Sequence, residues 1–134
     1  MARVKVERPL AYPADALWAL IGDFGGLHRW HPEVRQLDLS WEGRIRTLHF
    51  IDGTRAVERL EARNEEARRY VYTLVDGVLP VSDCRASLEV LDQGQGCLVV
   101  WSAEFLPRGG AAGEAGHALQ RLYSAGLASL GDTF

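Results

Sequence analysis

The sequence predicts an α+β fold in which a seven-stranded antiparallel sheet wraps around a long C-terminal helix. Three observations carry this prediction. Strand-like runs separated by turn residues fill the middle of the chain. Two short helical segments follow the first strand, and one long helical pattern ends the chain. Because consecutive hairpins give an antiparallel sheet with one apolar face, the helices must cover that face.

The size and composition of the chain limit the classes of protein to which it can belong. Its 134 residues fit one domain over 1–134. Hydrophobic residues make up 47% and charged residues 25% of the chain, which excludes disorder. The formal net charge of −3 argues against a nucleic-acid partner. The N-terminus lacks a signal-peptide pattern and no apolar run could span a membrane, so we expect a cytoplasmic protein without integral membrane association.

The first strand and the two short helices are predicted from the N-terminal quarter of the chain. Val4 and Val6 alternate with charged residues, which indicates a strand that ends at Pro9. A short helix then has one apolar side, formed by Leu17, Trp18, Leu20 and Ile21. A second helical turn is expected over Leu27–Trp30.

Six more strands and the long helix complete the expected order. The strands are predicted over Val34–Trp41, Ile45–Ile51, Arg55–Ala62, Arg69–Val75, Ser82–Leu91 and Cys97–Phe105. Asp52-Gly53 is the strongest turn signal between them, because both residues tolerate the positive φ of a tight hairpin. The final helix is expected over Ala111–Leu130. This arrangement is a helix-grip fold.

The most specific motif is Asp23-Phe24-Gly25-Gly26-Leu27 followed by Trp30-His31-Pro32. With it, the chain resembles the polyketide cyclase/dehydrase-like branch of the SRPBCC superfamily, which also contains START lipid-transfer domains and birch-pollen-allergen-like proteins. Supporting residues are Pro13, Ala14, Trp18, Gly43, Arg46, Leu48, Asp52-Gly53, Glu58-Arg59-Leu60, Tyr70, Tyr72, Leu79-Pro80-Val81, Asp83, Trp101 and Phe105. The resemblance covers essentially the whole chain. It implies a hydrophobic cavity between sheet and helix that binds a small apolar or amphipathic molecule.

Strand alternation predicts which side chains face this cavity. From the strands we expect Tyr70, Tyr72, Cys84, Ala86, Leu88, Val99, Trp101 and Ala103, and from the long helix Leu119, Leu122 and Gly126. Trp30 and His31 are expected at the cavity mouth. The relatives often have an aromatic residue where this chain has Cys84, so the cavity should be wider here. Cys84 and Cys97 are expected to be buried and unpaired, because their hairpin holds them far apart.

His49 and Glu58 are the candidate catalytic pair. The expected inner face of the third and fourth strands is mostly small and apolar and comprises Ile45, Thr47, His49, Ile51, Ala56, Glu58, Leu60 and Ala62. On it, His49 and Glu58 would be opposite or diagonal neighbours, and the carboxylate would prepare the imidazole to act as a base. The alternative is a charged cross-strand pair on the solvent face. His28 and His31 lack a third ligand at a recognised spacing, so we expect no metal and no cofactor.

Three functions stay open at this point. The one we favour is non-catalytic binding of a small hydrophobic or aromatic molecule. The second is a cyclase or dehydratase acting on a hydrophobic carbonyl compound, which needs His49 and Glu58 to face the cavity. The third is a protein-interaction domain of the cochaperone kind, which needs a collapsed cavity and an exposed apolar patch. A homodimer through a strand edge or through Trp41 also stays open.

Overall fold

The computed structural model describes residues 1–108 and 112–133. Within these residues, seven antiparallel strands form one sheet in the order β1-β7-β6-β5-β4-β3-β2. The expected helix-grip fold is confirmed, although the predicted first residue of the long helix, Ala111, lies outside the described residues. The elements are β1 (Ala2–Leu10), α1 (Ala14–Ile21), the 3-10 helix η1 (Phe24–Arg29), β2 (Val34–Ser40), β3 (Ile45–Phe50), β4 (Arg55–Asn64), β5 (Arg69–Gly77), β6 (Val81–Asp92), β7 (Cys97–Pro107) and α2 (Ala112–Thr133).

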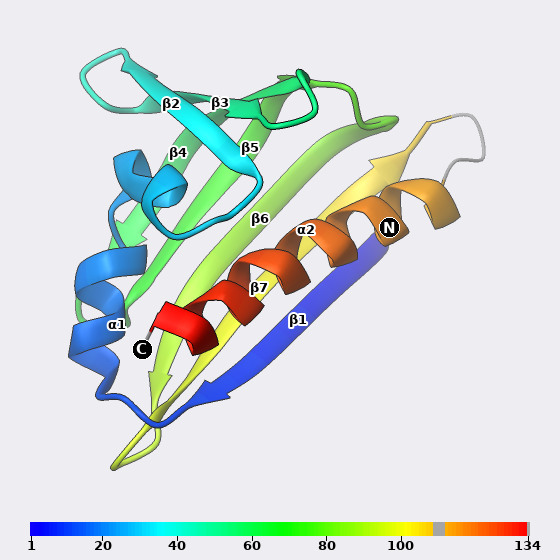
Figure 1. Cartoon of the computed structure of the whole chain (residues 1–134). Helices are drawn as coiled ribbons and strands as arrows, with labels where there is room; N and C mark the ends of the chain where they lie inside the picture. Colours follow the sequence, from blue (N-terminus) through cyan, green and yellow to red (C-terminus); the bar gives the residue numbers. More distant parts are fainter. Residues whose placement is uncertain (109–111, 134) are drawn as a thin grey trace.

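The sheet curves around α2, which runs diagonally along its concave side above β7 and β1 (Figure 1). The short helices α1 and η1 cover the same side of the sheet, where α1 contacts β6 and η1 contacts β2 (Figure 1). The sheet is open, with β1 and β2 at its edges. None of the helices in the described part of the chain is long and apolar enough to cross a membrane.

The short helices are held by local chemistry. The buried residues of α1 are Ala14, Leu17, Trp18 and Ile21, a helical spacing that turns one side to the core. The helix ends at Gly22, where a Cβ atom would lie 2.6 Å from the Trp18 carbonyl oxygen. The Asp23 carboxylate then caps η1 by accepting a hydrogen bond from the Gly25 N–H at 3.0 Å.

Alternation along β6 and β7 follows the prediction. The side chains buried on the concave face are Cys84, Ala86, Leu88 and Val90 from β6, and Cys97, Val99, Trp101, Ala103 and Phe105 from β7. Both cysteines are buried and unpaired, as expected. These two strands therefore supply the floor on which α2 packs.

The inner face of β3 is the opposite of the predicted one. Leu48 and Arg46 are buried, whereas Thr47 and His49 lie on the other face. A two-residue Asp52-Gly53 turn would pair Ile51 with Thr54, but the Phe50 N–H instead donates to the Thr54 carbonyl at 2.9 Å. The loop thus contains three residues and shifts the pairing of β3 by one position, which exchanges its two faces. The predicted inner face of β4 is correct for Ala56, Glu58 and Leu60, but it is wrong for Ala62, because a β-bulge after Leu60 turns Ala62 to the outer face, opposite Val71.

Candidate functional site

A cavity of about 460 Å³ opens between the middle of α2 and the loops at one end of the sheet. Its walls come from the β3–β4 hairpin, β5, the β5–β6 loop, β6 and one side of α2. The apolar lining comprises Phe50, Ala56, Leu74, Leu79, Leu119 and Leu122. Exposed lining residues, which include Asp52, Arg55 and Arg121, form a polar rim. The site is therefore an apolar pocket with a charged entrance.

Small side chains leave this space open. Ala56 on β4, Cys84 on β6 and Ala118 on α2 all line the cavity, and each fills far less volume than the leucines around it. The expectation that Cys84 widens the cavity agrees with its place in the wall. Burial raises the pKa of the Cys84 thiol to about 11, so the sulfur stays protonated and is a poor nucleophile.

A buried ion pair stands behind the cavity wall. The Arg46 guanidinium is 0% exposed, and its Nε donates to Oε1 of Glu58 at 2.8 Å. Its Nη1 donates to the Phe24 carbonyl at 3.0 Å and to the Tyr70 hydroxyl at 3.3 Å. The guanidinium also lies 4.1 Å from the centre of the Phe24 ring. Its Nη2 has no hydrogen-bond partner within residues 1–108 and 112–133.

Glu58 is the member of this pair that lines the cavity. It is 8% exposed, and only its Oε1 accepts a hydrogen bond from the described residues. Burial raises the pKa of the Glu58 carboxyl, an effect that Arg46 opposes. Burial would lower the pKa of Arg46, but Tyr70 and Glu58 outweigh it, so the guanidinium stays charged.

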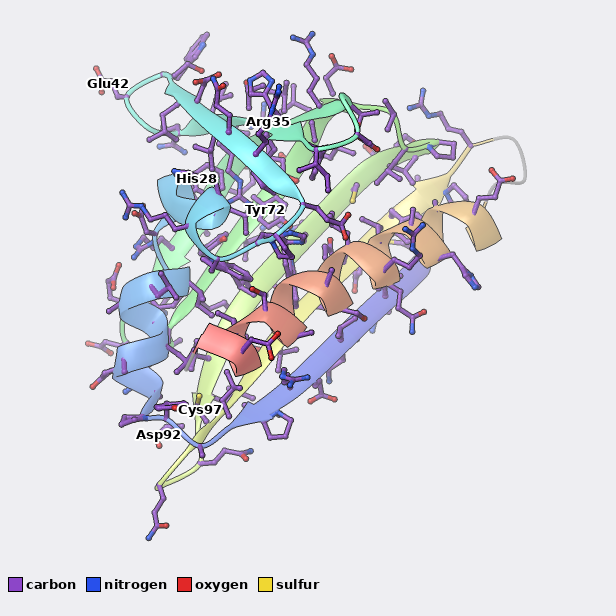
Figure 2. All side chains as sticks on the ribbon, in the orientation of Figure 1. His28, Arg35, Glu42, Tyr72, Asp92 and Cys97 are labelled. Atoms are coloured by element: carbon purple, nitrogen blue, oxygen red, sulfur yellow. The ribbon has the colours of Figure 1, made fainter. Side chains whose placement is uncertain are left out.

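Two tyrosines add polar groups to the wall. Tyr72 lies between the sheet and α2 (Figure 2), and its hydroxyl oxygen accepts a hydrogen bond from Nε1 of Trp101 at 2.9 Å. Tyr123 on α2 stacks on the Trp101 ring with centroids 4.2 Å apart. Burial raises the pKa of Tyr72 and Tyr123 well above the ordinary value, so both hydroxyls remain protonated.

The predicted pairing of His49 with Glu58 is wrong. In the β3–β4 register Glu58 lies opposite Arg46, and His49 lies opposite Arg55. The His49 side chain is 30% exposed on the convex face, where its Nε2 lies 2.8 Å from Oδ2 of Asp38. His49 therefore lies on the solvent face, as the alternative interpretation expected, but its cross-strand partner is Asp38 on β2 and not Glu58.

Trp30 and His31 are buried and do not line the cavity, so their expected position at its mouth is wrong. The His31 Nδ1 accepts from the Glu33 N–H at 3.1 Å, which fixes the proton on Nε2. That Nε2–H donates to the Leu122 carbonyl at 2.7 Å. Burial lowers the pKa of His31, so the ring is a neutral link between the segment before β2 and α2.

The predicted cavity residues divide into two groups. Tyr72, Cys84, Leu119 and Leu122 line the cavity. The others are packed in the core beside it, and they are Tyr70, Ala86, Leu88, Val99, Trp101, Ala103 and Gly126. Sequence reasoning missed Arg46 and Tyr123. Arg46 lies on the face of the third strand that was expected to point outward, because the opposite face is mostly small and apolar. The carboxylate of Glu58 on the predicted inner face of the next strand could have suggested a buried cationic partner.

No cluster of three or more His, Cys, Asp or Glu side chains that could hold a metal ion occurs in the described residues. The polar groups of the inner wall are the Glu58 carboxylate, which Arg46 compensates, a thiol and two phenols, and the other charged lining residues are Glu33, Asp52, Arg55 and Arg121. Such a set can orient an organic molecule by hydrogen bonds or move a proton at Glu58.

The whole chain, residues 1–134, matches the family described as polyketide cyclase/dehydrase and lipid transport. Among solved structures, the protein XoxI from Bacillus cereus is 31% identical, with 100% of this chain and 96% of that chain covered and a TM-score of 0.96. A Thermobifida fusca protein is 36% identical, with 98% and 91% covered and a TM-score of 0.86.

More distant structures share the fold alone. Norcoclaurine synthase from Thalictrum flavum, solved in complex with dopamine and hydroxybenzaldehyde, is 18% identical, with 98% of this chain and 85% of that chain covered and a TM-score of 0.78. Among curated proteins, none matches the chain significantly.

Proposed function

Because the chain belongs to the polyketide cyclase/dehydrase and lipid transport family, we propose that it binds a small hydrophobic or aromatic molecule in the cavity beside Glu58. The observation that carries the proposal is the cavity itself. It has about 460 Å³ of space, mostly aliphatic and aromatic walls, and few polar groups, which is the usual composition of a small-molecule site. Norcoclaurine synthase, which shares the fold, holds two small aromatic compounds.

Apolar burial supplies the driving force for such binding. Removing apolar surface from water contributes about 25 cal/mol per Å². Phe50, Leu119 and Leu122 offer that surface from β3 and α2. The exposed apolar side chains of Ile51 and Val78 lie at the entrance, where they can contact a molecule as it enters.

Naphthalene binding tests this proposal, because naphthalene has no polar group and reports burial alone. We expect saturable 1:1 binding to the wild type by calorimetry. Ala118→Trp should abolish it by filling the cavity from α2, whereas Ala128→Trp, on an exposed position of the same helix, should bind normally. Absence of binding to the wild type, or unchanged binding to Ala118→Trp, contradicts the proposal.

A second function is favoured by one observation, the presence of Glu58 in the cavity with a raised pKa. A carboxylate there could remove the proton beside the carbonyl of a bound ketone, as a cyclase or dehydratase requires. His49 takes no part, because it lies on the other face of the sheet. The test is deuterium exchange into 2-tetralone in D₂O. If the protein is such an enzyme, the wild type exchanges deuterium faster than buffer alone, and Glu58→Gln loses this extra exchange. Exchange by the wild type at the rate of buffer alone excludes the enzymatic function.

The predictions of a protein-interaction domain, a homodimer and a cytoplasmic location receive less support. A protein-interaction domain would require a collapsed cavity, and the space beside α2 is open. Trp41 is 77% exposed at the β2–β3 turn, but a homodimer through it stays a prediction, as does a cytoplasmic location.

A further inference from the structure

The cavity contains an acceptor that its own walls leave unused. Glu58 is more than nine-tenths buried and lines the cavity, and Arg46 engages only its Oε1. Within the described ranges, Oε2 accepts no hydrogen bond. This oxygen is not sealed from the cavity, so water can reach it in the free protein. A bound molecule that covers Oε2 without supplying a donor leaves it unpaired, which is costly, so a molecule that supplies a donor gains more here.

The neighbouring polar groups do not compete for this role. The hydroxyl oxygen of Tyr72 already accepts from Trp101 Nε1 at 2.9 Å. The Cys84 thiol is a weak donor and a weak acceptor. On α2, the Tyr123 hydroxyl is neutral and therefore a weaker acceptor than a carboxylate. Glu33 and Asp52 also line the cavity, but the first is half-buried and the second is exposed. Glu58 is therefore the most deeply buried carboxylate that a ligand meets in the cavity.

The charge balance indicates which kind of donor fits. Arg46 is fully buried and 2.8 Å from Glu58, so the pair carries no net charge for a cation to neutralise. The other charged lining residues, Glu33, Asp52, Arg55 and Arg121, add two negative and two positive charges and so no net charge. Beside Glu58, an ammonium group would lose its hydration without gaining an unpaired counter-charge, whereas a hydroxyl loses much less water.

We infer that the ligand is an uncharged apolar molecule bearing a hydroxyl group, and that this hydroxyl donates a hydrogen bond to Oε2 of Glu58. This inference rests on the proposed function, because it needs the cavity to be a binding site. It makes Glu58 the residue that selects among molecules of equal apolar surface.

Three naphthalene derivatives test it on the wild-type protein by calorimetry at about pH 8, where the hydroxyl of 2-naphthol is still protonated. We expect 2-naphthol to bind at least about tenfold more tightly than 2-methoxynaphthalene, which has the oxygen but no donor. It should also bind more tightly than 2-naphthylmethylamine, which carries a charged donor. Equal affinity for the first two compounds, or tightest binding of the amine, would overturn the inference.

Two variants locate the effect. In Glu58→Gln, Arg46 should hold the amide oxygen and the amide nitrogen should face the cavity as a donor, so the preference for 2-naphthol should disappear. Glu61→Gln, on the same strand but outside the cavity and paired with Arg59, should keep it. A preference that survives Glu58→Gln contradicts the inference.

The wild-type comparison stands even if Glu58→Gln fails to fold. It also separates the two proposals. If 2-naphthol and 2-methoxynaphthalene bind equally well, only the role of Glu58 is wrong. If none of these compounds nor naphthalene binds, both the proposed function and this inference are overturned.

Discussion

The two halves of α2 meet the sheet in different ways. Towards its C-terminal end, Tyr123, Leu127 and Leu130 are buried against the core, and Gly126 lets His31 and Trp101 approach the helix closely. Around residues 118–122, the helix is instead one wall of a cavity. One helix thus supplies both the tight packing that stabilises the fold and the open space that can hold a ligand, and Tyr123 borders both regions.

The same contrast occurs across the thickness of β3. Arg46 on its inner face and His49 on its outer face each lie 2.8 Å from a carboxylate. The first pair is excluded from water and the second is open to it. Equal distances therefore do not mean equal importance, because the environment decides what each pair contributes.

The largest expected effect is at the inner pair. Arg46→Leu leaves the Glu58 carboxylate buried without its counter-charge, and we expect the free energy of unfolding to fall by about 3–5 kcal/mol. Urea denaturation measures this loss. Arg46→Leu combined with Glu58→Leu should recover most of it, since no isolated charge remains. A loss below about 1 kcal/mol in the single variant would show that the pair is not structurally important.

Gly126 tests the closed half of α2. A Cβ atom there would lie 2.7 Å from Cδ2 of His31 and 3.0 Å from Cζ3 of Trp101, so we expect Gly126→Ala to destabilise by about 1–3 kcal/mol. Gly116→Ala is the matched control, because its Cβ atom would meet only Val4 Cγ2, at 3.8 Å. The control should stabilise the protein by up to about 1 kcal/mol through helix propensity. Equal thermal shifts in the two variants would contradict the close packing at Gly126.

The neutral link at His31 predicts a pH dependence of stability. Burial lowers the pKa of His31 below 6.5, so the unfolded chain binds a proton that the folded protein does not. The contribution of His31 to the free energy of unfolding is fully present above pH 6.5. It decreases as the pH falls from 6.5 towards the pKa of His31 in the folded protein, with a limiting slope of about 1.4 kcal/mol per pH unit.

Comparison with His31→Gln isolates this contribution, because both proteins keep Glu58, whose raised pKa acts in the opposite direction. The free energy of unfolding should fall more steeply in the wild type than in the variant between about pH 7 and pH 5. Parallel pH profiles would show that His31 is not held neutral.

The smallest effect is expected at the outer pair. His49→Ala removes a partly exposed imidazole from Asp38, and we expect a change of less than about 1 kcal/mol in stability. Naphthalene affinity should not change, because His49 does not line the cavity. A large loss of binding in this variant would restore His49 as a candidate site residue.

Much of this arrangement could be predicted from the sequence. Alternation gave the correct faces on β7 and on β6 from Cys84 onward, because the charged and hydroxyl side chains of these segments all lie on one face. It failed on β3, where the turn of Phe50 to Thr54 contains one residue more than the Asp52-Gly53 signal suggests. The cavity was placed between the correct layers but extended too far. Periodicity identifies which residues lie on the inner face of a strand. Which of them line the cavity, and which pack directly against α2, depends on where the helix lies in three dimensions.

Chemical-shift mapping with naphthalene tests the central claim most directly. In ¹H–¹⁵N spectra of the wild type, amides of residues 50–56, 77–79 and 118–123 should shift in proportion to occupancy. Those of the closed half, such as Leu127 and Leu130, should shift little. Shifts confined to the convex face of the sheet, or spread evenly over both halves of α2, would contradict the division of the helix into a packed half and a ligand-binding half.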